Sequence, residues 1–139
     1  MGKAFTGGCA CGAIHYEIDD EPIAQSDCQC RVCQRKSGTG HGSYLTFPQK
    51  SKVTLTGDAT HWDIAADSGS NIKTHSFCST CGSPVYLTLS AWPDLFVIHA
   101  GSLDDPGRYQ PQAITYRIRG HDWDRVNPAL TAFDKMPPM

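Results

Sequence analysis

Seven cysteines lie in three groups along the 139-residue sequence, two pairs and one triplet. Thiolate sulfur is a preferred ligand of zinc, and a C-x-x-C pair lets two sulfurs face one ion while backbone NH groups hydrogen-bond to them. An odd number of cysteines also argues against a disulfide framework. The groups are Cys9 and Cys11, then Cys28, Cys30 and Cys33, and finally Cys78 and Cys81. We therefore expect metal binding.

The two outer pairs together supply the four ligands of a tetrahedral structural zinc site. We expect Cys9 and Cys11 to meet Cys78 and Cys81, so that the ion cross-links distant parts of the chain. One alternative is that some of these residues are buried free cysteines. Another is that Cys78 and Cys81 form a redox pair, but no helical pattern follows Gly82, as a thioredoxin-like site would require.

The central triplet, Cys28, Cys30 and Cys33, has no partner pair. Three protein ligands with an exchangeable fourth position are typical of a catalytic zinc. We therefore predict two zinc ions per chain, one structural and one catalytic. The alternative is that an Asp or a histidine from elsewhere closes the central site. The histidine candidates are His41, His75, His99 and His121.

Several groups near the triplet in sequence could serve a reaction there. Arg31, Arg35 and Lys36 could bind the carboxylates of a substrate, or could simply offset thiolate charge or remain solvated. The glycine-rich stretch SGTGHGS follows the triplet and suits either a close approach to a ligand or a tight turn. Within it, His41 is the candidate proton shuttle, although such a histidine is more often merely exposed.

Composition excludes some classes of function. Twelve basic and 14 acidic residues give a formal charge of -2, which makes a nucleic-acid or anionic-membrane partner unfavourable. The sequence has no apolar run of signal-peptide or membrane-spanning length. Seven cysteines without a disulfide pattern fit a reducing compartment, so we expect a cytoplasmic protein. The oligomeric state is not indicated.

Short alternating segments separated by Gly, Pro, Asp or Ser predict a mostly β fold. We expect one zinc-stabilised domain over residues 1–139, made of twisted antiparallel sheets with short helical turns. Its core covers about residues 3–125, and the proline-containing tail 126–139 is expected to pack loosely. A helix is predicted over 31–37, ended by Gly38, and a turn at 121–124. The predicted strands are 13–18, 43–47, 52–56, 60–65, 72–77, 85–89, 95–100 and 114–118.

Four segments in order resemble the glutathione-dependent formaldehyde-activating enzyme family, which includes centromere protein V-like members. The segments are GGCACG, SDCQCRVCQRKSG, HSFCSTCGSPVY and HAGSLDDPGRYQP. The resemblance covers most of the chain and implies a structural zinc on the outer pairs, a catalytic zinc on the triplet, and a fold of twisted β-sheets. Many members carry His where this chain has Gln29, and many carry His after the position of Pro111, where this chain reads QAITY.

The resemblance implies a carbon–sulfur lyase that condenses glutathione with formaldehyde to S-hydroxymethylglutathione, or acts on a related thiol adduct. Arg31, Arg35 and Lys36 would then bind glutathione. The alternative is a non-enzymatic zinc module that binds a protein or nucleic acid, for which the charge of -2 is unfavourable. A redox sensor is a third reading, but C-x-C spacing strains a disulfide.

Overall fold

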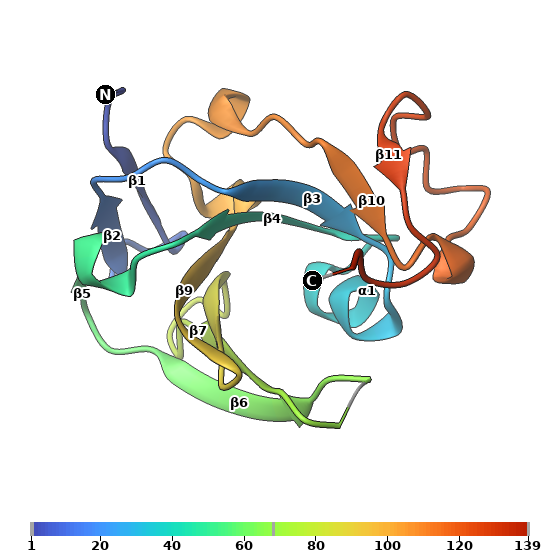
Figure 1. The fold of residues 1–139 in the computed structure, drawn as a ribbon. Coiled ribbons are helices and arrows are strands. Elements are labelled where there is room, and N and C mark those ends of the chain that lie inside the picture. The colour runs from blue at the N-terminus through green and yellow to red at the C-terminus, as the bar shows by residue number, and fades with distance from the viewer. Residues whose placement is uncertain (1, 68, 139) are drawn as a thin grey trace.

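The computed structural model describes residues 2–67 and 69–138. Within them, the strands form a three-stranded and an eight-stranded sheet (Figure 1). The small sheet has the order β1 (Phe5–Gly8), β2 (His15–Ile18) and β5 (Val53–Thr56). The large sheet has the order β11 (Thr131–Ala132), β10 (Ala113–Thr115), β3 (Ala24–Cys28), β4 (Gly42–Phe47), β9 (Trp92–His99), β8 (Pro84–Leu89), β7 (Ile72–Phe77) and β6 (Thr60–Ala65).

The predicted mostly β fold is confirmed. Every pairing in the small sheet is antiparallel. In the large sheet, the successive neighbours β3, β4, β9, β8, β7 and β6 also pair antiparallel. Strand β10 instead runs parallel to both of its neighbours, β3 and β11. The strand predicted over 114–118 ends earlier, at Thr115. Tyr116 adopts a left-handed conformation with φ 54°, and the 3-10 turn Arg117–Arg119 follows it.

The large sheet separates two hydrophobic cores because successive side chains of a strand point to opposite faces. On one face, Leu45 of β4 packs with Phe5 and Tyr16 of the small sheet. On the other face, Tyr44 packs with Leu87 of β8 and with the central cysteines. Figure 1 shows the large sheet curling, with helix α1 (Arg31–Ser37) and the C-terminus inside the curl. The central cysteines therefore lie inside the curl.

The predicted helix over 31–37 is confirmed, and local chemistry explains both ends. Cys30 caps the beginning, because its Sγ accepts a hydrogen bond of 3.2 Å from the backbone NH of Cys33. Gly38 ends the helix with φ 77°, and its NH donates to the carbonyl of Gln34. No helix within the described residues is long and apolar enough to cross a membrane.

The C-terminal segment joins the edge of the large sheet through β11. The NH of Phe133 donates to the carbonyl of Ile114 over 2.8 Å, and the NH of Tyr116 donates to the carbonyl of Lys135 over 3.0 Å. The predicted turn at 121–124 is present, with the NH of Asp124 bonded to the carbonyl of His121. The single-domain organisation and the loose packing of the tail stay predictions, and Met1, Ser68 and Met139 lie outside the described residues.

Candidate metal centres

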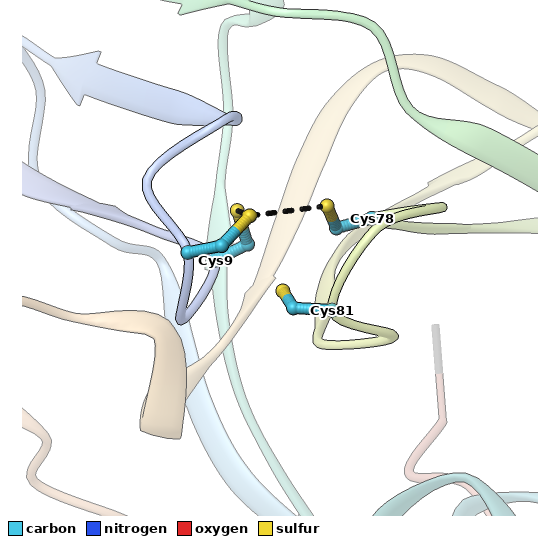
Figure 2. Close-up of side chains that lie close together, drawn as sticks. Cys9, Cys78 and Cys81 are labelled. Carbon is cyan, nitrogen blue, oxygen red and sulfur yellow. Dashed lines mark hydrogen bonds between the residues drawn. The ribbon is translucent and has the colours of Figure 1, made fainter.

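The two outer cysteine pairs meet in space. The Sγ atoms of Cys9, Cys11, Cys78 and Cys81 all lie within 4.8 Å of one another. Cys11 Sγ lies 3.6 Å from Cys9 Sγ and 3.7 Å from Cys78 Sγ. Figure 2 shows Cys9 extending from the loop after β1 toward Cys78 and Cys81 in the turn after β7. Four converging sulfurs are the donor set of a closed metal site.

Backbone NH groups hold this outer cluster in place. The NH of Ile14 donates to Cys9 Sγ over 3.2 Å, and this bond lowers the pKa of the Cys9 thiol. The NH of Thr80 donates to Cys78 Sγ over 3.4 Å. The hydroxyl and the NH of Ser83 lower the pKa of Cys81 to about 5. Donors aimed at sulfur favour the thiolate, which is the form that binds metal.

The central triplet also converges. The Sγ atoms of Cys28, Cys30 and Cys33 lie within 4.8 Å of one another, and all three residues are buried. Cys28 ends β3, Cys30 caps α1, and Cys33 lies in its first turn, so the strand-to-helix junction brings them together. Within residues 2–67 and 69–138, no His, Asp or Glu joins the three sulfurs within that distance. The histidines proposed to close the site therefore do not do so here.

The three thiols of the central triplet shift one another's pKa values in opposite directions. Hydrogen bonds from the side chains of Cys28 and Cys33 lower the pKa of Cys30 to about 2. The corresponding bonds with Cys30 and Cys28 raise the pKa of Cys28 and of Cys33. Three adjacent thiolates repel one another, whereas a bound divalent cation allows all three to ionise. The triplet therefore has the chemistry of a site that could hold a metal ion.

Two polar side chains outside the triplet hold it in position. The Tyr44 hydroxyl donates to Cys33 Sγ over 3.1 Å. The buried Gln34 amide donates to the carbonyl of Gln29 over 2.7 Å and to that of Arg119 over 3.0 Å. These bonds join α1 to β4, to the loop between Cys28 and Cys30, and to the 3-10 turn after β10. Neighbours of this kind fix the orientation of metal ligands.

Two cavities adjoin the central triplet. The smaller, of about 140 Å³, is lined by Cys28 and Cys33 together with the side chains of Tyr44, Lys73 and His75 and several aliphatic residues. The larger, of about 530 Å³, is also lined by Cys28 and Lys73. Its other lining residues are Ala66, Asp67, Asn71, Leu89, Trp92, Tyr116, Lys135 and Met136. The triplet therefore lies beside space that a small molecule could occupy.

The basic residues that neighbour the triplet in sequence line a different cavity. Arg31, Arg35 and Lys36 surround a space of about 280 Å³ with Trp62 and Ile64. The Arg31 guanidinium donates to the Gln34 side chain. The Lys36 ammonium lies 4.7 Å from the ring centroid of Phe77, and burial lowers its pKa. Binding of a substrate by these three residues stays a prediction.

His41 likewise lies away from the central triplet, because the cavity that it lines shares no lining residue with the two cavities beside the triplet. That cavity of about 640 Å³ borders the outer cluster at Cys9. His41 Nδ1 lies 2.8 Å from a carboxylate oxygen of Asp124. A Cβ atom on Gly40 would lie 2.3 Å from Asp124 Cγ, so the glycine-rich stretch permits a tight return beside this carboxylate. The role of His41 as a proton shuttle stays a prediction.

Gln34, Tyr44 and Lys73 were not predicted to act at the central site, and His75 was predicted there only as a possible fourth ligand. Lys73 and His75 come from β7, far from the triplet in sequence, and reach it because β7, β8, β9 and β4 are successive neighbours in the large sheet. Their alternation along 72–77 was the available signal that both point to one face. Whether that face is the one with the central triplet depends on the order of the strands in the large sheet.

Comparisons with known proteins give consistent results. The family described as "Glutathione-dependent formaldehyde-activating enzyme" matches residues 4–119. A curated protein of Halomonas elongata that carries the same family name is 24% identical over 125 residues, which are 86% of this chain and 79% of that protein. The crystal structure of a Rhodobacter sphaeroides protein has a TM-score of 0.55 at 21% identity, covering 71% of this chain and 87% of that one. The structural similarity supports the fold.

Proposed function

Because the chain belongs to the glutathione-dependent formaldehyde-activating enzyme family, we propose that it catalyses the reversible condensation of glutathione with formaldehyde. The product is S-hydroxymethylglutathione, and in the reverse direction the enzyme acts as a carbon–sulfur lyase. In the forward direction, the thiolate sulfur forms a bond to the carbonyl carbon, and the π-bond electron pair moves to oxygen. The proton that the thiol released ends on that oxygen, so the reaction needs no oxidant or reductant.

The observation that carries this proposal is the central triplet at the wall of two cavities. Cys28 lines both of them, and no fourth protein ligand closes the triplet among the described residues. A closed four-sulfur set, such as the outer cluster, is suited to structure alone. A three-sulfur set beside a cavity leaves a coordination position for a substrate atom.

We propose that both clusters hold zinc, giving one structural and one catalytic ion per chain. Cys9, Cys11, Cys78 and Cys81 would hold the first, and Cys28, Cys30 and Cys33 the second. An ion held by Cys28, Cys30 and Cys33 would lower the pKa of a bound thiol and so favour its thiolate form at neutral pH. These reduced cysteines and reduced glutathione fit a reducing compartment, and we propose the cytoplasm.

The larger cavity has the charges that glutathione requires. The tripeptide carries two carboxylates and one ammonium group. Lys73 and Lys135 could pair with the carboxylates, and Asp67 with the ammonium. Because Cys28 lines this cavity, a tripeptide bound there has its thiol within reach of the triplet. This geometry favours Lys73 and Lys135 over Arg31, Arg35 and Lys36 as the carboxylate partners.

Exchange spectroscopy by NMR on mixtures of glutathione and formaldehyde tests the proposed activity. We expect zinc-loaded protein to accelerate exchange above the spontaneous rate, and we expect a Cys30→Ser variant to lose that acceleration. A Ser79→Ala variant is the matched control, because Ser79 is exposed in the turn between two ligands of the outer cluster. No acceleration by protein with both clusters loaded would reject this activity and favour the non-enzymatic metal module.

A further inference from the structure

His75 is a buried polar side chain whose hydrogen-bonding capacity is unused within the described part of the chain. It lies in the middle of β7, and only 1% of its surface is exposed. Neither Nδ1 nor Nε2 has a hydrogen-bond partner among residues 2–67 and 69–138. Leaving a buried polar group unpaired is unfavourable, because the group has lost its hydrogen bonds to water. Most buried imidazoles are paired, so this one needs an explanation.

The explanation lies in the cavity of about 140 Å³ that His75 lines. Leu87, Leu89 and Val97 line part of it and offer no side-chain hydrogen bond, whereas Ser26, Thr46, Lys73 and Thr115 also line it and are polar. None of these side chains is bonded to His75 among the described residues. The Tyr44 hydroxyl, which also faces this cavity, already donates to Cys33 Sγ. His75 is thus a polar group with free capacity beside the sulfurs of the central triplet.

The ring of His75 is held in a fixed position. Its centroid lies 5.9 Å from that of Trp62 on the adjacent strand β6, and Leu87 is its direct neighbour on β8. Lys36 and Lys73 are the cations near it. Neutral imidazole has one N–H donor and one acceptor nitrogen. A ring fixed between two strands can present its donor to an oxygen without further ordering.

Resting on the proposed function, we propose that His75 binds the oxygen of the small carbonyl compound that reacts beside the central triplet. Its N–H donates a hydrogen bond to the carbonyl oxygen, and the bond strengthens as the carbon–sulfur bond forms and negative charge moves onto that oxygen. His75 neither loses nor gains a proton in the overall step. The reverse reaction uses the same bond to hold the hydroxyl oxygen of the thiol adduct.

The cavity volume sets a bound on this compound. A cavity of comparable size can hold a molecule as large as benzene, so formaldehyde and other short aldehydes fit beside the sulfur of the thiol. We therefore expect a preference for short aldehydes over bulkier carbonyl compounds.

The test uses zinc-loaded protein and two substitutions at one position. His75→Leu removes both nitrogens and keeps an apolar side chain, whereas His75→Gln restores an N–H donor. We expect kcat/KM for formaldehyde to fall about 100-fold in His75→Leu, the low end of the loss when one oxyanion donor is removed. We expect His75→Gln to recover part of the lost kcat/KM for formaldehyde. The KM for glutathione should be unchanged in both His75 variants.

His61→Gln is the matched control. His61 lies on β6, its Nδ1 is 2.7 Å from the Ser76 hydroxyl, and it lines neither cavity beside the triplet. We expect His61→Gln to leave both kcat/KM for formaldehyde and KM for glutathione unchanged. A second measurement is independent of turnover. The imidazole NMR signals of His75, assigned by their loss in His75→Leu, should shift when formaldehyde is added to protein already saturated with glutathione.

The outcomes separate this inference from the proposed function. If wild-type protein does not accelerate adduct formation, the proposed function fails and the role of His75 fails with it. If wild-type protein is active but His75→Leu keeps its kcat/KM, the proposed function stands and the role of His75 is wrong. Unchanged imidazole signals in the presence of both substrates would reject direct binding to the oxygen, even if activity is lost.

Discussion

The Tyr44 hydroxyl donates a hydrogen bond of 3.1 Å to Cys33 Sγ. Tyr44 belongs to β4 in the middle of the large sheet, and Cys33 lies in the first turn of α1. The bond therefore connects the sheet to the helix that carries the central triplet. Because a hydroxyl donor favours a thiolate acceptor, it also helps Cys33 to carry charge when a cation is bound.

Loss of this bond should weaken metal binding at the central site. Tyr44→Phe removes the hydroxyl and keeps the ring, so we expect the affinity of the central site for zinc to fall about 10-fold, as when an outer partner of a metal ligand is lost. Competition with a chelator of known affinity measures the change. Tyr86→Phe is the control, since Tyr86 packs against Phe96 in the other core. Equal affinities in the two variants would mean that the bond has no effect on metal binding.

The two clusters should differ in how strongly they stabilise the fold. The outer one joins Cys11 to Cys78, which are 67 positions apart in sequence, whereas the central one joins residues already held by a strand end and a helix cap. A cross-link that closes a long loop removes more unfolded-state entropy. We expect Cys11→Ser and Cys30→Ser each to lose one equivalent of zinc, and Cys11→Ser to cause the larger fall in Tm.

Metal analysis and calorimetry on the same samples test this difference. Ser79→Ala, in the loop between Cys78 and Cys81, should keep both equivalents and the wild-type Tm, because its side chain is exposed. A larger fall in Tm for Cys30→Ser than for Cys11→Ser would contradict the assignment of the outer cluster as the structural one.

Sequence reasoning predicted the fold best where local chemistry decides the structure. Helix α1 was predicted with its end at a left-handed Gly38, which the structure confirms, and the cap at Cys30 was found only in the structure. Strand β3 was missed because AQSDC has neither alternation nor β-branched residues. It forms because β4 and β10 pair with both of its edges. Strand propensity depends on such neighbours, and they were not visible in the sequence.

The candidate site could likewise be predicted only where its residues are neighbours in the sequence. Cysteine spacing indicated both clusters, because ligand pairs and triplets are local in sequence. The cavity beside the triplet depends on which strands become neighbours, so Lys73 was missed and His75 was considered only as a ligand. Arg31 and Arg35 were favoured because they are close to the triplet in sequence. In the structure they line a separate cavity with Trp62 of β6.

Gly40 should be sensitive to the addition of a single methyl group. Its Cβ would lie 2.3 Å from Cγ of Asp124, whose carboxylate also contacts His41. We expect Gly40→Ala to lower the free energy of unfolding by about 1–3 kcal/mol, as overpacking does elsewhere. Gly101→Ala is the control, since its Cβ would have no atom within 4 Å. Denaturant unfolding of both variants measures the difference, and equal stabilities would show that the Asp124 turn moves away freely.

Stability should fall in acid partly because of His99. Burial lowers the pKa of this histidine from 6.5 to about 4. Between these values the unfolded chain binds a proton that the folded chain does not, so the free energy of unfolding falls as the pH falls. One such group contributes a slope of up to about 1.4 kcal/mol per pH unit, and its stabilisation is fully present above pH 6.5. His99→Phe should reduce this slope.

Urea unfolding at several pH values between 4 and 7 measures the slope. Both proteins contain the same cysteines, so the difference between their slopes isolates His99 from metal release. His15→Phe is the control, because His15 is exposed on β2. Parallel pH profiles for wild type and His99→Phe would rule out this histidine as a source of the acid sensitivity.

Two lysines in the cavity of about 530 Å³ should affect the affinity for glutathione. Lys73 and Lys135 line it together with Cys28. If they pair with the glutathione carboxylates, replacing both with Gln should raise the KM for glutathione about 10-fold or more, since a charge-assisted hydrogen bond contributes about 1.5–3 kcal/mol. The same variant should react normally with 2-mercaptoethanol, which has no carboxylate. Replacing Arg31 and Arg35 with Gln is the matched comparison, and it should raise neither KM. A KM for glutathione that rises only in the arginine variant would transfer carboxylate binding to the cavity beside Trp62.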